Sequence, residues 1–126
     1  MSAINWFELP ATDFERAVAF YETAFGVTMR REEIAGGPNA IFPYEQGKGP
    51  GGAIINTKYS QPSKDGAIVY LNAQSAANLD QVLSRIETAG GKVVMPKTDI
   101  GPVGFIAMIL DTEGNRVGLH AEHPEA

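Results

Sequence analysis

The sequence predicts an α+β fold built from two similar halves, each with one strand, one helix and three more strands. Two stretches place apolar residues three and four positions apart, which is the spacing of a helical face. Short apolar runs bounded by glycine and proline lie around both stretches, as expected for strands. A shift of 65 residues superposes the two helical faces and matches Phe14 with Leu79. We therefore expect one domain over residues 1–126, made of a first module at 1–60 and a second module at 61–126.

A strand and a helix open the first half. The strand is expected at Ile4–Leu9, and Pro10 ends it. Thr12 and Glu15 have the spacing of a capping box, in which each side chain accepts the other residue's backbone N–H. Gly26 is expected to end the helix in the left-handed conformation. The apolar face of this helix consists of Phe14, Ala17, Val18, Tyr21 and Phe25.

Three further strands complete the first half. Two glycine-rich clusters, at 36–39 and 47–52, are expected to form the turns between them. The second cluster lacks the GxxxxGK[ST] spacing of a phosphate-binding loop, so a plain connection is the better interpretation. The expected strands cover residues 27–34, 40–44 and 52–57.

The second half repeats this order. A strand at 67–73 precedes a helix that Gly90 and Gly91 are expected to end. Residues 112–115 have the composition of a hairpin turn between the last two strands. The helical face consists of Leu79, Val82, Leu83 and Ile86, and the later strands are expected at 92–95, 103–110 and 116–121.

Composition excludes several classes of function. The 15 acidic and 10 basic residues give a net charge of −5, which argues against a nucleic-acid partner. The chain has no cysteine, so disulfides, thiol nucleophiles and cysteine-ligated metals are excluded. No apolar run approaches the ~20 residues of a membrane span, and the first residues lack the features of a signal peptide. We expect a cytoplasmic protein without a membrane partner.

Two segments resemble one known family. Residues 13–21, followed by Phe25 and Gly26, are similar to the first helix of the vicinal oxygen chelate superfamily, which includes glyoxalase I, extradiol dioxygenases and bleomycin-resistance proteins. Residues 110–117 resemble the closing hairpin of that family. The resemblance implies two βαβββ modules that form a curled mixed-sheet cup, with the helices on the convex side. It also implies metal-assisted chemistry, in which a divalent ion in the cup acts as a Lewis acid on two substrate oxygens.

The residues at the family's four metal-ligand positions depart from its pattern. The resemblance places these positions at Trp6, within residues 52–55, at Ile68 or Tyr70, and at Gly118. None of these residues is histidine, glutamine or glutamate, whereas metal ligation needs carboxylate, imidazole or amide donors. We therefore expect no metal and no other cofactor.

Glu8 and His120 alternate inward on the strands that carry the first and last ligand positions. The two side chains can act as an acid–base pair, since each can shift the pKa of the other. Two alternatives stay open: a structural ion pair, or displaced metal ligands assisted by Glu122 or His123. His123 is otherwise expected to be a solvated residue of the tail.

An aromatic and apolar pocket is expected beside this pair. Lys97, on the connection before a strand, is either a cation above the pocket or a solvated loop residue. The Trp6 ring either stacks on a planar ligand or belongs to the core. The expected ligand-binding residues are Trp6, Phe42 (or Ile41 in the other register), Tyr44, Tyr70, Ile106, Met108 and Lys97.

The sequence thus favours a small-molecule binding protein or a metal-independent enzyme that holds a small organic ligand in its cup. A metal-dependent lyase or dioxygenase related to lactoylglutathione lyase is the first alternative, and a non-catalytic partner-binding module is the second. A homodimer is expected, because pairing would close open sheet edges.

Overall fold

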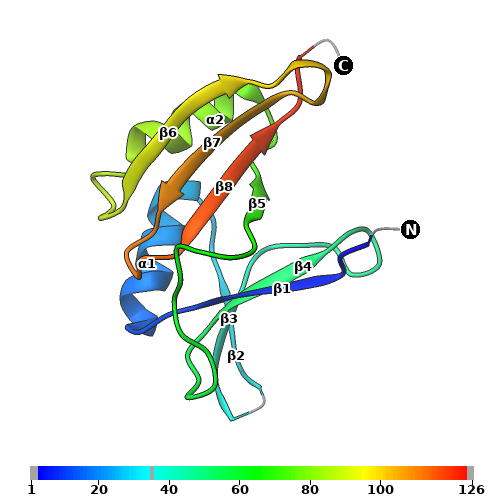
Figure 1. Cartoon of the computed structure of the whole chain (residues 1–126). Coiled ribbons are helices and arrows are strands. Elements are labelled where there is room, and N and C mark those ends of the chain that lie inside the picture. Colours follow the sequence, from blue (N-terminus) through cyan, green and yellow to red (C-terminus); the bar gives the residue numbers. More distant parts are fainter. Residues whose placement is uncertain (1–2, 35, 125–126) are drawn as a thin grey trace.

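The computed structural model describes residues 3–34 and 36–124 and shows two four-stranded sheets with two helices (Figure 1). Each half runs strand, helix and three strands, as predicted. The first half contains β1 (Trp6–Pro10), α1 (Phe14–Phe25), β2 (Arg30–Ile34), β3 (Gly37–Ile41) and β4 (Gly51–Ile55). The second half contains β5 (Val69–Asn72), α2 (Ala76–Arg85), β6 (Lys92–Asp99), the short 3-10 helix η1 (Gly101–Val103), β7 (Phe105–Leu110) and β8 (Arg116–Ala121).

Both sheets are mixed and share one strand order. The first sheet runs β1-β4-β3-β2 and the second runs β5-β8-β7-β6. In each sheet the first strand pairs with the last in parallel, and the other pairs are antiparallel. The predicted α+β class and the βαβββ order are therefore confirmed, and β1 and β5 are edge strands of their sheets.

Alternate residues of both sheets pack against the helices in one shared core. Leu9 and Ile54 of the first sheet and Ile109 and Leu119 of the second are almost fully buried there. The helices α1 and α2 also contact each other. Because neighbouring residues of a strand face opposite ways, the side chains between these core residues lie on the opposite, helix-free face. Neither described helix is long and apolar enough to cross a membrane.

The start of α1 differs from the prediction. Asp13, and not Thr12, is the N-cap, and its Oδ1 accepts the Arg16 backbone N–H at 3.0 Å. The predicted capping box of Thr12 and Glu15 is wrong: the backbone N–H of the N-cap Asp13 donates at 2.7 Å to Glu113 from the distant closing hairpin. A contact between the two ends of the chain has replaced a local one.

Other boundaries also reflect tertiary pairing. Gly26 ends α1 with φ 67°, as predicted. Residues 37–39, predicted to be part of a turn, pair with β2 and begin β3. Residues 96–99, predicted to be a loop, belong to β6, where an irregular pairing with β7 accommodates the proline. The N-caps Asp13 and Ser75 are 62 residues apart (75 − 13), so the structural repeat is three residues shorter than predicted.

A buried polar network joins the closing hairpin to α1. The Asp111 carboxylate accepts hydrogen bonds from the Tyr21 hydroxyl at 2.6 Å and the Asn115 amide at 3.0 Å. It also accepts the backbone N–H groups of Glu113 and Asn115 at 2.8 and 2.9 Å. The Asn115 amide further donates to the Pro10 carbonyl at 2.7 Å. Burial raises the pKa of the Tyr21 phenol, and the Asp111 charge raises it further, so the hydroxyl remains a donor.

We expect the Glu113 carboxylate to make stability depend on pH. Burial by itself would raise the pKa of Glu113, but hydrogen bonds from Arg16, the Asp13 backbone and Thr112 hold it at about 2, below the ordinary 4.5. A carboxylate with a lowered folded-state pKa stabilises the fold above pH 4.5, and this contribution is lost as the pH falls toward 2. Because the Arg16 side chain is half exposed, we expect the loss to be about 1–2 kcal/mol.

Urea unfolding of the parent and of Glu113→Gln between pH 7 and pH 2 measures this contribution. The free energies of unfolding should differ near neutral pH and converge at low pH. A gap that stays constant over the whole range would contradict the assignment.

Candidate functional site

An apolar hollow of about 450 Å³, the seam hollow, lies between the two edge strands β1 and β5. Trp6 of β1 and Tyr70 of β5, both predicted to bind ligand, line it together. They are 38% and 44% exposed, so both rings are accessible from solvent. The seam hollow is lined by Ile4, Trp6, Phe7, Pro50, Ile68, Val69, Tyr70, Leu71 and Asn72.

Two more hollows border Tyr70 on the helix-free face of the second sheet. One, of about 370 Å³, is lined by Ile106 and His120 together with Val103 of η1 and Ile100. Met108 lies on the same face of β7, two residues beyond Ile106. The other, of about 410 Å³, is lined by Tyr70, Asn72, Gln74, His120 and Glu122. Tyr70 therefore belongs to all three hollows.

Aromatic rings cover glycines on the helix-free face of both modules. Tyr70 pairs with Gly118 across β5 and β8, and a Cβ added to Gly118 would lie 2.3 Å from the Tyr70 ring. In the first module a Cβ added to Gly51 would lie 2.8 Å from the Tyr44 ring. Tyr44 also contacts Trp6 edge-on, with ring centroids 6.0 Å apart. The absence of a side chain at these glycines gives the rings their places.

Glu8 and His120 each have a partner other than one another. Trp6 Nε1 donates to Glu8 Oε2 at 3.3 Å. His120 Nε2 lies 2.6 Å from the Val103 carbonyl oxygen, so Nε2 donates in this contact. Within residues 3–34 and 36–124, no hydrogen bond or ion pair joins Glu8 to His120. The catalytic role of the two residues stays a prediction.

His123 was predicted to be a solvated tail residue, and this was wrong. Its Nε2 lies 2.9 Å from the Gly101 carbonyl oxygen and 3.2 Å from Asp99 Oδ1. Its ring packs edge-on against Phe105, with centroids 4.5 Å apart. His120 and His123 thus connect η1 to the end of β8, beside the hollow of about 370 Å³ that Val103 and His120 line.

Two predicted ligand residues lie on the helix side of their sheets. Lys97 belongs to β6, and its Nζ lies 3.0 Å from Asp80 of α2, so its interpretation as a loop residue was wrong. Phe42 packs in the core, with its ring centroid 5.4 Å from that of Tyr21. Its alternative, Ile41, lies on the helix-free face. Strand register, which the sequence left open, decides all of these placements.

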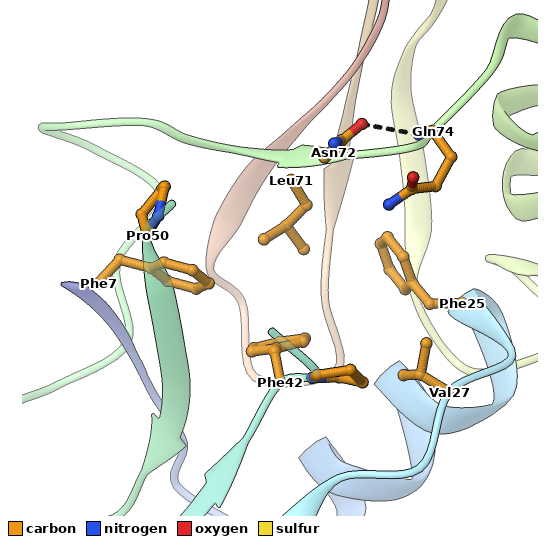
Figure 2. A pocket seen from close by; sticks show the side chains of 9 residues that line it. Phe7, Phe25, Val27, Phe42, Pro50, Leu71, Asn72 and Gln74 are labelled. Atoms are coloured by element: carbon orange, nitrogen blue, oxygen red, sulfur yellow. Dashed lines mark hydrogen bonds between the residues drawn. The ribbon is translucent and has the colours of Figure 1, made fainter. Parts of the chain in front are cut away.

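A smaller cleft of about 220 Å³ opens on the helix side, between the end of α1 and β5 (Figure 2). We call it the helix-side cleft. Its two polar lining residues, Asn72 and Gln74, were not predicted from the sequence to belong to a site. Asn72 Oδ1 accepts the Gln74 backbone N–H at 2.8 Å, and the Asn-x-Gln spacing before a helix was the available signal. The cleft is lined by Phe7, Phe25, Val27, Phe42, Pro43, Pro50, Leu71, Asn72 and Gln74.

The four positions at which the resemblance implies metal ligands carry no histidine, glutamine or glutamate. Among the described residues, no three histidine, aspartate or glutamate side chains gather closely enough to hold a metal ion. Gly118 has no donor, and the Tyr70 ring takes the space beside it.

The fold and its solvent-accessible hollows are those of a two-module βαβββ protein with room for a small molecule. Residues 3–119 match the Glyoxalase/Bleomycin resistance protein/Dioxygenase superfamily. The chain belongs to this superfamily, which confirms the family that the first helix and the closing hairpin indicated.

Three known proteins illustrate the relationship. The chain is 31% identical over 117 residues to the putative glyoxylase CFP32 of Mycobacterium tuberculosis (strain CDC 1551 / Oshkosh), covering 91% of this chain and 44% of that protein. It is 30% identical over 123 residues to a glyoxylase-like domain-containing protein of Didymella fabae, covering 89% and 88%. The crystal structure of a glyoxalase/bleomycin resistance protein from Albidiferax ferrireducens T118 has the same fold, with a TM-score of 0.73, 17% identity and coverage of 94% and 97%. The chain thus spans less than half of the mycobacterial relative.

Proposed function

We propose that this protein binds a small planar organic molecule in the seam hollow, without a metal ion held by its own side chains. The observation that carries the proposal is the position of Tyr70, which lines all three hollows and lies over Gly118. Trp6 lines the same hollow from the other module. Two accessible aromatic rings beside one apolar hollow favour a ligand with a flat, apolar ring system.

His120 and Glu122 give the neighbouring hollow a polar end. A ligand that reaches from the seam hollow past Tyr70 would place a polar substituent beside the His120 imidazole. If the protein is an enzyme, His120 is the group best placed for proton transfer, because it lines the hollow beside Tyr70, whereas Glu8 accepts a hydrogen bond from the Trp6 indole. The module boundaries at residue 60 and the homodimer stay predictions.

The binding proposal is tested with 1,4-naphthoquinone, a planar quencher of indole fluorescence. Trp6 is the sole tryptophan of the chain, so its emission reports on the seam hollow. We expect saturable quenching, which Tyr70→Ala weakens by about tenfold through the loss of a stacking partner and its buried area. Tyr59→Ala is the matched control, because Tyr59 is 83% exposed and lines none of the described hollows.

Quenching that rises linearly without saturation would indicate collisions rather than binding. Equal affinity in Tyr70→Ala and Tyr59→Ala would remove Tyr70 from the site. Either result would refute the proposed site.

Family membership favours one competing function, a metal-dependent lyase or dioxygenase. A metal that binds only the folded protein must raise the melting temperature by mass action. The four metal-ligand positions that the resemblance implies carry no carboxylate, imidazole or amide side chain. We therefore expect zinc, nickel and ferrous ions to leave the melting temperature unchanged. A saturable rise that EDTA reverses would establish a metal site and favour the competing function.

A further inference from the structure

We propose a second binding site, in the helix-side cleft, for one neutral aromatic ring that carries a hydroxyl or carbonyl group. The cleft opens beside the end of α1 and is not lined by Trp6, Tyr70 or His120. It adjoins the seam hollow, with which it shares Phe7, Pro50, Leu71 and Asn72. Figure 2 shows its residues arranged around a common space, with Leu71 and Gln74 from the β5 side and Phe42 and Val27 facing them.

The aromatic floor of the cleft is fixed by the core. Phe25 and Phe42 pack against Tyr21, with ring centroids 5.8 and 5.4 Å away, and Phe7 lies 5.6 Å from Phe42. Tyr21 is fully buried, and its hydroxyl is bonded to Asp111. A cleft whose walls are already ordered loses little conformational entropy when a ligand enters.

The size and charge of the cleft limit the class of ligand. An apolar cavity of about 150 Å³ accommodates benzene. The 220 Å³ of this cleft therefore admits one ring with a small substituent. All nine lining residues are uncharged, and His120 and Glu122 line only the adjoining hollow, which shares Asn72 and Gln74 with the cleft. An ionised ligand would lose hydration without meeting a counter-charge, so the cleft selects a neutral one.

Gln74 supplies the polar contact. Figure 2 shows its amide directed toward the cleft, above Phe25. Its side chain makes no hydrogen bond to another described residue, so both the donor and the acceptor of the amide remain available. Gln74 has a φ of 75°, which is in the left-handed region. This conformation is energetically unfavourable for a residue other than glycine, and it persists only when the surroundings impose it. Here Asn72 holds the backbone N–H of Gln74.

Phenol, followed by methyl NMR, tests this site. Val27 lines the cleft and not the seam hollow, and Ile68 lines the seam hollow and not the cleft. We expect phenol to shift the Val27 methyl signals saturably and to leave the Ile68 signals in place. Val27→Phe should fill the cleft and weaken binding by about tenfold or more. Val94→Phe makes the same change at an exposed position of β6 and should bind as the parent does, with Val27 still present as the reporter.

Gln74→Asn tests the amide, since asparagine tolerates the left-handed conformation and only shortens the side chain. It should weaken phenol binding and leave benzene binding unchanged. Two results in the parent protein would overturn the proposal, even if Val27→Phe did not fold. One is that phenol shifts the methyl signals of Ile68 and not those of Val27, and the other is that it causes no saturable shift at Val27. Naphthoquinone quenching of Trp6 should be the same in Val27→Phe, because Val27 does not line the seam hollow. Equal quenching would therefore distinguish the two sites although they share four lining residues.

Discussion

Asp111→Ala is expected to destabilise the protein by about 3–5 kcal/mol, because it removes the acceptor of a buried polar network. The carboxylate receives the Tyr21 hydroxyl, the Asn115 amide and two backbone N–H groups. Without it, the fully buried Tyr21 hydroxyl would lose the acceptor of its hydrogen bond. A domain of this size has a total stability of about 5–15 kcal/mol, so the loss is a large fraction.

Urea unfolding measures this effect, and two variants show its origin. Tyr21→Phe deletes one hydrogen bond to the charged group and should cost about 1.5–3 kcal/mol, less than Asp111→Ala. Asp65→Ala, at an exposed loop aspartate, should change stability by less than about 0.5 kcal/mol. If Asp111→Ala lost no more than Asp65→Ala, the network would contribute nothing to stability.

The sequence predicted the parts of the fold that depend on local pattern. Helical spacing located α1, and Gly26 ended it where a left-handed residue was expected. The turn at 112–115 was predicted because its residues favour a tight reversal. The N-cap was missed because its decisive partner, Glu113, lies 100 residues away in the sequence. No local pattern contains such a contact.

The candidate site could be predicted only in part for a similar reason. Strand alternation brought Trp6 and Tyr70 to one hollow, as expected. It could not show that Phe7 and Leu71, whose side chains point toward the core, also line that hollow where the two edge strands face each other. Lys97 was predicted to lie in a loop because β6 pairs irregularly with β7 around Pro96, and the sequence pattern does not indicate such a strand.

Gly118→Glu is the second change with a large expected effect, because it introduces a carboxylate at one of the four ligand positions that the family resemblance implies. The new Cβ would lie 2.3 Å from Cδ1 of Tyr70, an atom close to the ring's attachment, so the ring must leave its place. Overpacking of this kind costs about 1–3 kcal/mol. With the ring displaced from the seam hollow, naphthoquinone affinity should fall by about tenfold.

A double-mutant cycle separates this steric effect from the added charge. Gly118→Ala should already lose stability, and Tyr70→Ala should suppress most of that loss, because the methyl group then meets no ring. Gly118→Glu combined with Tyr70→Ala should also be more stable than expected from the sum of the two single losses. A zinc titration of this double variant then tests whether one introduced carboxylate is enough to bind metal. If the costs of Gly118→Ala and Tyr70→Ala were simply additive, the glycine would not hold the ring in place. Packing of Tyr70 would then not explain why glycine stands at this ligand position.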